Sequence, residues 1–396
     1  MTGAPDILGP DRRPAFFQVA NAGDLGLEPP DDRHGLSLRT WVRALAGMQK
    51  EALVVNGATG RAWRLISDEG PYLAGHDRAP CPLCTFITGM VAAYANEITG
   101  LAQTQGIDID DLELTLGNHY SMEGSALKGT MLGGAMSPDL VVDIAADADP
   151  ADLEDLVRQA VSASPVNGLL SGEKNSLFTL SWNGAQVPVG EVAALGADAH
   201  PAPDGLFDGV ELADLAVADD LMTRVKTADQ VEGVPGGVNT SLQDSQSRTL
   251  HVQARCRVRE DGIKVIDENL FQPIGSEFRF LSDESPEAGG QGLAPDAASY
   301  LAAGIGFCFM TQFGRYASIT KKQLDDYRIV QDLHFAPGGP GNPGDADPVE
   351  THVYLDTPEG EDFARKTLDM GERTCFLHAT CRTDLTPEVE VNVGGR

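Results

Sequence analysis

The sequence predicts an α+β protein made of two related halves, each with an antiparallel sheet that packs on a helix rich in small residues. Alternating apolar and polar segments, typical of strands, occur in both halves and precede an apolar helix. An Asp-Glu-x-Pro loop occurs twice, at 68–71 and at 283–286. When Asp68 is aligned with Asp283, positions 64–119 align with 279–334 without a gap, and we call this the first register. The chain therefore resembles a diverged tandem repeat.

Chain length also favours two domains. A chain of 396 residues is longer than a domain with one hydrophobic core usually is, and it suits two units of about 200 residues or fewer. We expect an irregular arm at 1–35, a first domain at 36–184, an acidic linker at 185–247 and a second domain at 248–396. The linker matches nothing in the other half, and its segment 210–225 is compatible with a helix. A connection of this length is expected to pack in part on the domains.

The first half shows strand patterns and two helices. Strands are expected at 36–45, 62–66, 112–120, 139–144 and 176–182. Pro80 suits the first turn of a helix, and apolar side chains follow it at helical spacing as far as Tyr94. A second, amphipathic helix is expected at 150–161.

The second half repeats this order. Strands are expected at 249–258, 262–268, 277–281, 326–335, 351–355 and 387–393, and helices at 294–316 and 360–373. The second half therefore has the order of three strands, a helix, two strands, a helix and a strand, and we expect the first half to share it.

Charge and composition exclude some functions. The net charge of −30 argues against nucleic acid and anionic membranes as partners, because phosphate binding needs clustered Lys and Arg. No apolar run approaches the roughly 20 residues that span a bilayer, and the N-terminus lacks the apolar core of a secretory signal. Six cysteines in such a chain predict reduced thiols in a cytoplasm.

Two cysteines of the second half occupy distinctive positions. Cys308 lies near the middle of the small-residue helix 294–316, and Cys375 follows the later amphipathic helix. In the first register Cys308 falls on Ala93. Towards the end of each half, a second register places 394–395 on 183–184, and in it Cys375 falls on Ser164. The chemistry is therefore expected in the second half alone.

These features resemble the OsmC/Ohr family of thiol peroxidases. The match rests on a Gly-rich loop, the Ala-Ala-Gly-x-x-x-Cys sequence 302–308, and Cys375 before a Val-rich terminal strand. The resemblance implies an intertwined dimer fold, formed here within one chain as a pseudo-dimer. It also implies that Cys308 is the nucleophile that attacks an organic hydroperoxide, and that Cys375 resolves the oxidised thiol as a disulfide.

Family members orient the reactive cysteine with an Arg and a Glu. Arg259, in an Arg-x-Asp-Gly hairpin, is the expected cation, with Arg257 and Arg279 as alternatives. The expected Glu position holds Ala298, and the nearest carboxylates are Asp296 and Glu287. The resemblance implies no cofactor and a dithiol reductant, of lipoyl type or another. We expect an apolar pocket whose walls include positions 307, 309 and 310.

Alternatives remain open. Cys381 is a second candidate for the resolving thiol. Cys256, in a strand, is expected to pack in the core without a chemical role. Cys81 and Cys84 form a Cys-x-x-Cys sequence at a helix start, where thiolates are stabilised. A metal site would need two further ligands, for which His76 and His119 are the only candidates, and no metal site is predicted. The alternative functions are other sulfur or small-molecule chemistry at Cys81 and Cys84, or a non-catalytic binding protein.

Overall fold

The computed structural model describes residues 14–125, 128–215, 220–228, 246–272 and 274–394. Up to position 182 the strands are β1 (Phe17–Gln18), β2 (Leu36–Ala44), β3 (Lys50–Asn56), β4 (Ala62–Ser67), β5 (Ile109–Gly124), β6 (Leu132–Ala135), β7 (Asp139–Ala146) and β8 (Leu177–Trp182). The helices of this part are α1 (Pro82–Gln105), α2 (Pro150–Ala163) and α3 (Val166–Leu170).

The rest of the chain repeats this order after a connecting segment. The connecting segment holds β9 (Ala185–Val187), β10 (Ala193–Ala194) and β11 (Met222–Lys226). The later strands are β12 (Gln246–Val258), β13 (Lys264–Gln272), β14 (Glu277–Ser282), β15 (Asp326–Ala336), β16 (Asp345–Ala346), β17 (Glu350–Asp356) and β18 (Glu388–Val393). The later helices are α4 (Ala297–Thr320), α5 (Glu361–Thr374) and α6 (Phe376–Arg382).

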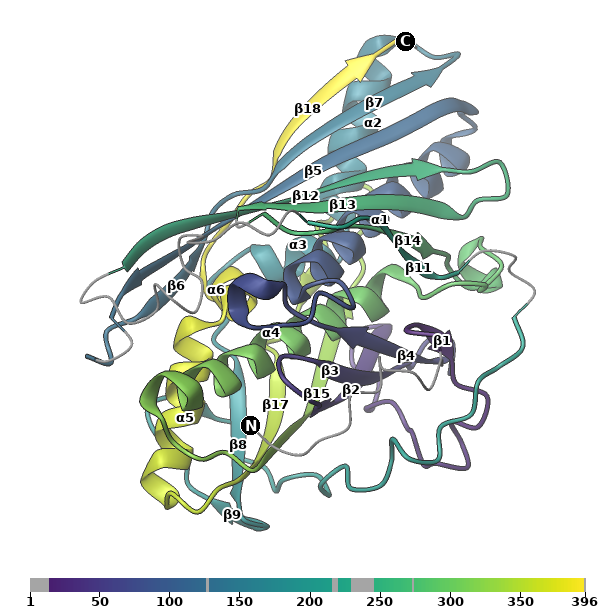
Figure 1. Cartoon of the computed structure of the whole chain (residues 1–396). Helices are drawn as coiled ribbons and strands as arrows, with labels where there is room; N and C mark the ends of the chain where they lie inside the picture. Colours follow the sequence, from purple (N-terminus) through teal and green to yellow (C-terminus); the bar gives the residue numbers. More distant parts are fainter. Residues whose placement is uncertain (1–13, 126–127, 216–219, 229–245, 273, 395–396) are drawn as a thin grey trace.

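Two sheets enclose the long helices α1 and α4 (Figure 1). One sheet has the strand order β1-β4-β3-β2-β15-β17-β8-β10, and the other has the order β11-β14-β13-β12-β5-β7-β18. In the first sheet β2 pairs antiparallel with β15, and β8 pairs parallel with β17. In the second sheet β12 pairs antiparallel with β5, and β18 pairs parallel with β7. Each sheet therefore contains strands from both halves of the sequence.

Corresponding elements begin and end at equivalent positions. The first register places α4 on α1 from the first residue to the last, because Ala297 falls on Pro82 and Thr320 on Gln105. The second register does the same for α5 on α2 and for β18 on β8. The two registers found in the sequence thus describe equivalent elements of the fold.

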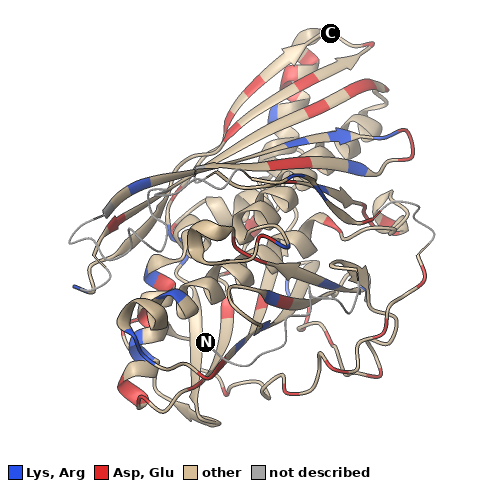
Figure 2. Ribbon diagram, in the orientation of Figure 1, with Lys and Arg blue, Asp and Glu red and all other residues tan. Residues whose placement is uncertain are grey.

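The central helices are apolar and well capped. Helix α1 contains one charged residue, Glu97, and α4 contains one, Arg315. Figure 2 shows that Asp and Glu lie mainly on the strands, the outer helices and the connecting segment, while α1 and α4 are almost free of charge. Asp296 caps α4, because its Oδ1 accepts the backbone N–H of Ser299 at 2.9 Å. This pattern suits helices that are buried between two sheets.

Helices α1 and α4 pack closely where each has a glycine. A Cβ atom on Gly89 would lie 2.7 Å from the carbonyl oxygen of Ala297, and one on Gly304 would lie 2.7 Å from the Cβ of Phe86. These two glycines are equivalent in the first register. The missing side chains therefore allow the backbones to approach one another.

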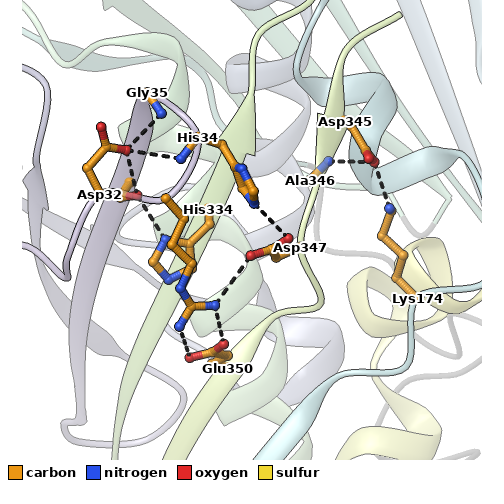
Figure 3. Close-up of polar contacts among 11 residues, drawn as sticks. Asp32, His34, Gly35, Lys174, His334, Asp345, Ala346, Asp347 and Glu350 are labelled. Carbon is orange, nitrogen blue, oxygen red and sulfur yellow. Dashed lines mark hydrogen bonds and ion pairs between the residues drawn. The ribbon is translucent and has the colours of Figure 1, made fainter.

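The N-terminal segment and the connecting segment both pack on the body. Figure 3 shows His34, from the N-terminal segment, directed at Asp347, with Nε2 and Oδ1 3.0 Å apart. It also shows Lys174, which lies between α3 and β8, donating to Asp345 at 2.8 Å. Strand β9 pairs with β8, and Phe207 is buried. These contacts join parts of the chain that are distant in sequence.

The helix expected at 210–225 is wrong. Within the described residues of this range, 210–215 and 220–225, the structure has no helix and instead places β11 along the edge of β14. The open edge of β14 supplies backbone hydrogen bonds that a short, isolated helix would lack. The short helices α3 and α6 have no counterpart among the elements that the sequence predicts.

Candidate active site

Cys308 and Cys375 meet in the interior. Cys308 lies in the middle of α4, and Cys375 lies between α5 and α6, which pack against α4. The two Sγ atoms are 3.3 Å apart, with the thiol of Cys375 as donor. Both side chains are buried. The structure therefore brings together the two cysteines that the sequence nominates as nucleophile and resolving thiol, and it gives Cys375 rather than Cys381 this contact.

Burial raises the pKa of Cys375 well above its ordinary value, and the hydrogen bond to Cys308 acts in the same direction. Backbone N–H groups of Leu377 and His378 oppose this rise. A thiol with a raised pKa keeps its proton at neutral pH and can donate it. In this pair Cys308 accepts the hydrogen bond that Cys375 donates.

A small cavity of about 30 Å³ lies beside Cys308. Its apolar wall includes Leu83, Leu250, Leu270 and Phe376. A cavity of this size admits about one or two water-sized groups. The expected wall positions 307, 309 and 310 hold side chains that are instead fully buried in the core and do not line this cavity.

Arg315 supplies a positive charge to the cavity. It lies seven residues after Cys308, on nearly the same face of α4 because two helical turns span about seven residues, and it is 7% exposed. Its Nη1 donates to Gln312 at 3.4 Å, while Nη2 has no hydrogen-bond partner among the described residues. Burial lowers the pKa of Arg315, and electrostatic interactions with Glu69, Tyr72 and Cys308 oppose that shift.

Lys50 and Glu69 approach the same region from the first half of the chain. Glu69 accepts hydrogen bonds from the hydroxyls of Tyr72 at 2.8 Å and Thr311 at 3.2 Å. Burial raises the pKa of Glu69, and the charge of Lys50 opposes it. Burial lowers the pKa of Lys50, while Glu69, Asp68 and Cys308 oppose that shift. The site therefore combines the cysteines of one half with Lys50 and Glu69 of the other, which interact electrostatically.

The arginines named from the sequence lie elsewhere. Arg259 pairs with Asp261 at 2.7 Å in the exposed hairpin between β12 and β13. Arg257 and Arg279 both pair with Asp267, at 3.3 Å and 2.6 Å, on the surface of the sheet. None of the three is among the residues that line the Cys308 cavity.

Asp296 also has a structural position rather than one beside Cys308. Besides the backbone of Ser299 it accepts the Ser299 hydroxyl at 2.8 Å and the side chain of Asn56 at 3.1 Å. It caps α4 twelve residues before Cys308, which is about 18 Å along a helix. The carboxylate that lines the cavity is Glu69, from the other half.

Sequence reasoning missed Arg315, Lys50 and Glu69. Arg315 carries a usable signal, because a lone charge in an apolar helix, seven residues after a cysteine, lies on the same face as that cysteine. Glu69 belongs to the repeated Asp-Glu-x-Pro loop. Its position beside Cys308, like that of Lys50, follows only from the pairing of the two halves.

The remaining thiols fall into two groups. Cys256 and Cys381 are buried away from this cavity, and burial raises the pKa of each to about 12. Cys81 lines the same cavity as Cys308, and its Sγ lies 2.7 Å from that of Cys84. Within the described residues no group of three His, Cys, Asp or Glu side chains is arranged to hold a metal ion.

The equivalent position in the first half lacks the reactive groups. In the two registers, Cys308, Arg315 and Cys375 correspond to Ala93, Gly100 and Ser164. A cavity of about 230 Å³ lies there, lined by Ala93, Glu97 and Glu284 among others. Burial raises the pKa of Glu97 and of Glu284 to about 7. This cavity contains no thiol among its lining residues and cannot perform cysteine chemistry.

Comparison with known proteins identifies part of the chain. Residues 289–390 match the family model of OsmC-like proteins. This OsmC-like region contains both Cys308 and Cys375, and it covers most of the second half. Among curated proteins none matches the chain.

A solved structure also resembles part of the chain. It is the crystal structure of an OsmC-like hydroperoxide resistance protein from Jannaschia sp. CCS1. The similarity covers 33% of this chain and 83% of that chain, with 20% sequence identity and a TM-score of 0.20.

Proposed function

We propose that the protein is a cysteine-based peroxidase that reduces organic hydroperoxides, with Cys308 as the nucleophile and Cys375 as the resolving thiol. The observation that carries this proposal is the 3.3 Å contact between the two sulfur atoms beside a cavity that contains a buried, incompletely paired arginine. The OsmC-like family match over residues 289–390 supports the same conclusion.

In the first step the Cys308 thiolate attacks the terminal oxygen of R–O–OH. The S–O bond forms, the O–O bond breaks, and the alkoxide leaves and takes up a proton to give ROH. Arg315 stabilises the negative charge on the attacking sulfur and then on the leaving oxygen, because its Nη2 is available to donate within a buried cavity. The small cavity accepts the –O–OH group itself, and a larger alkyl group must displace apolar wall residues such as Leu83.

In the second step the Cys375 sulfur attacks the Cys308 sulfenic acid. A disulfide forms and water leaves, with the sulfenic hydroxyl taking the proton from the Cys375 thiol. The 3.3 Å separation means that the sulfur atoms need only a small further approach to bond. A dithiol reductant then restores both thiols by exchange.

The interleaved sheets extend the proposal to the whole molecule. The two halves act as an intramolecular pseudo-dimer of OsmC-like domains, 36–184 and 248–396, in which one of two equivalent sites is active. Lys50 and Glu69 of the first half complete the site in the second, so neither half would work alone. The described helices include none that is long and apolar enough to cross a membrane. Thiol chemistry of this kind fits a reducing cytoplasm.

The experiment is peroxide turnover with tert-butyl hydroperoxide and a small dithiol. Cys308→Ser is expected to abolish turnover, and Cys375→Ser to permit one oxidation per chain before turnover stops. Cys381→Ser, which removes a buried thiol outside the cavity, is the matched control and is expected to retain parental turnover. Parental turnover in the Cys308→Ser protein would refute the proposal.

A further inference from the structure

The Cys81–Cys84 pair is not used in the proposed reaction, yet it lies at the same cavity. Cys81 lines the cavity together with Cys308, and the Sγ atoms of Cys81 and Cys84 are 2.7 Å apart. Burial raises the pKa of Tyr120, and Cys308, Cys81 and Cys375 add to this rise. One cysteine of each thiol pair, Cys81 and Cys308, therefore lines the same small cavity.

The equivalent position in the second half shows what an ordinary helix start requires. In the first register, Cys81 and Cys84 correspond to Asp296 and Ser299. Asp296 accepts the backbone N–H and the hydroxyl of Ser299, and in α1 the Sγ of Cys81 accepts the backbone N–H of Cys84 at 3.4 Å. A sulfur is a weaker acceptor than a carboxylate. Capping alone therefore gives no reason for a cysteine pair, and the pair occurs at the helix start that adjoins Cys308.

We propose that Cys81 and Cys84 form an internal dithiol that reduces the Cys308–Cys375 disulfide. This inference rests on the proposed peroxidase function and adds the route by which electrons reach the buried site. An external dithiol would then reduce the Cys81–Cys84 disulfide.

The exchange takes place in two balanced steps. The Cys81 thiolate attacks the Cys308 sulfur, which forms a Cys81–Cys308 disulfide and releases the Cys375 thiolate to take up a proton. The Cys84 thiolate then attacks the Cys81 sulfur and releases the Cys308 thiolate. Two electrons pass from one pair to the other, and Cys308 is restored as the nucleophile.

A buried carboxyl, Glu268, interacts with Cys84 and adds to the rise in the pKa of that thiol. Glu268 of β13 lies beside Cys84, and it is 2% exposed. Burial raises the pKa of Glu268 to about 8, so the group exchanges protons near neutral pH. Burial also raises the pKa of Cys81 and of Cys84. Both thiols are therefore mainly protonated at neutral pH, and each must lose its proton before it attacks a sulfur.

The test is a titration of the fully reduced full-length protein with tert-butyl hydroperoxide in the absence of any other reductant. We call the reduction of the Cys308–Cys375 disulfide by Cys81 and Cys84 the relay. It predicts that the parental chain consumes two equivalents of hydroperoxide and that the Cys81→Ser/Cys84→Ser protein consumes one, because only the parental chain can reduce its Cys308–Cys375 disulfide once and react again. Serine at both positions keeps an N-cap acceptor and reproduces Ser299. After one equivalent, mass spectrometry of the parental protein should find the Cys81–Cys84 disulfide with Cys308 and Cys375 reduced.

Single variants test the order of events. Cys84→Ser should accumulate a Cys81–Cys308 disulfide, and Cys308→Ser should keep Cys81 and Cys84 reduced. Consumption of one equivalent by the parental chain, with a persistent Cys308–Cys375 disulfide and reduced Cys81 and Cys84, would overturn the relay and leave the peroxidase intact. Equal oxidation of Cys81 and Cys84 in the Cys308→Ser protein would also overturn it. Absence of any oxidation at Cys308 would overturn both proposals.

Discussion

After the cysteines, Arg315 is the side chain on which the proposed reaction depends most. A buried guanidinium is costly unless its donors are satisfied, and Nη2 of Arg315 has no hydrogen-bond partner within the described part of the chain. In the proposed reaction the negative charge lies on the Cys308 thiolate before attack and on the departing alkoxide afterwards. Interaction with these charges would offset the cost of burying Arg315.

Replacement of Arg315 by methionine tests this role. Methionine keeps much of the volume but removes the charge, and a hydrogen bond to a charged group contributes about 1.5–3 kcal/mol. We expect Cys308 oxidation by tert-butyl hydroperoxide to slow by about 10-fold or more, measured as the second-order rate in single turnover. Arg259→Met removes an exposed arginine that pairs with Asp261 and should leave the rate unchanged. Equal rates in the two variants would contradict the assignment.

The sequence identifies the two cysteines of the candidate site, but it does not identify the charged side chains around them. The positions of Cys308 and Cys375 follow from motifs along the chain, and the structure places them together. Arg259 is favoured by the sequence because its hairpin resembles a known turn, but the structure places that hairpin in solvent, away from the cavity. A motif match does not report the direction of a side chain, whereas the helical spacing from Cys308 to Arg315 does.

At the scale of elements, the contact between α1 and α4 controls the position of Cys308. The helices approach through Gly89 and Gly304, and Gly304 lies one turn before Cys308. Any side chain at Gly304 must push α4 away from Phe86. The same displacement would move Cys308 relative to Cys375.

Gly304→Ala should therefore lower the free energy of unfolding by about 1–3 kcal/mol, as overpacking does in well-packed cores. Gly100 is the matched control, because it lies in α1 and an added Cβ would meet no atom within 4 Å. Gly100→Ala should raise stability by up to about 1 kcal/mol, since alanine is the better helix former. Urea unfolding of both variants is the measurement, and stabilisation by Gly304→Ala would contradict the packing described here.

The ion pair between Arg39 of β2 and Asp332 of β15 joins the two halves within one sheet. Nε and Nη2 of Arg39 each lie 2.7 Å from an oxygen of Asp332. Burial by itself would raise the pKa of Asp332, but the hydrogen bonds from Arg39 and the interaction with His200 outweigh it and lower the pKa to about 2. The folded state therefore favours the ionised carboxylate relative to the unfolded chain, whose pKa is about 3.9.

This pKa shift predicts a stability difference with a definite pH dependence. A depressed folded-state pKa contributes stability that is complete above about pH 4 and is lost as the pH falls through about 2. Asp332→Asn should cost about 2 kcal/mol or more at pH 7, with the difference from the parental protein shrinking below pH 4. Unfolding free energies measured from pH 2 to pH 7 check this, and a pH-independent difference would contradict the electrostatic origin.

The long helices follow from the sequence, whereas the short helices α3 and α6 do not. The pattern that predicts a helix at 360–373 corresponds to α5, at Glu361–Thr374. Helices α3 and α6 have 5 and 7 residues, too few for an apolar period to be recognised. The pattern at β11 is compatible with a helix, yet its residues form a strand because they gain their structure from the edge of β14.

At the scale of the whole molecule, groups of strands from the two halves alternate within each sheet, and the patterns along the sequence do not predict this arrangement. The repeat predicts equivalent elements, but it does not tell which strands pair. Strand β2 pairs with β15 through residues that are far apart in the sequence, such as Leu38 and Leu333. The resemblance to a dimeric family suggests this pairing, whereas periodicity and spacing do not.

The shared sheets predict how fragments of the chain behave. Residues 1–228 expressed alone should be insoluble or self-associate, because the edges that meet β15 and β12 would be exposed together with an apolar face. Co-expression with residues 246–396 should give a soluble one-to-one complex. Size-exclusion chromatography with mass measurement distinguishes a self-associated fragment, a monomer and a one-to-one complex. A soluble, monomeric first fragment with native-like cooperative unfolding would show that the halves fold independently.

The central claim is that Cys308 is the sulfur that a hydroperoxide oxidises. The most direct measurement is to treat the Cys375→Ser/Cys81→Ser/Cys84→Ser protein, in which all three neighbouring thiols of Cys308 are replaced, with one equivalent of tert-butyl hydroperoxide and dimedone. Mass spectrometry then locates the sulfenic acid adduct. The account predicts a nearly complete adduct on Cys308 and none on Cys256 or Cys381. An unmodified Cys308, with the hydroperoxide still present or the adduct on another thiol, would contradict it.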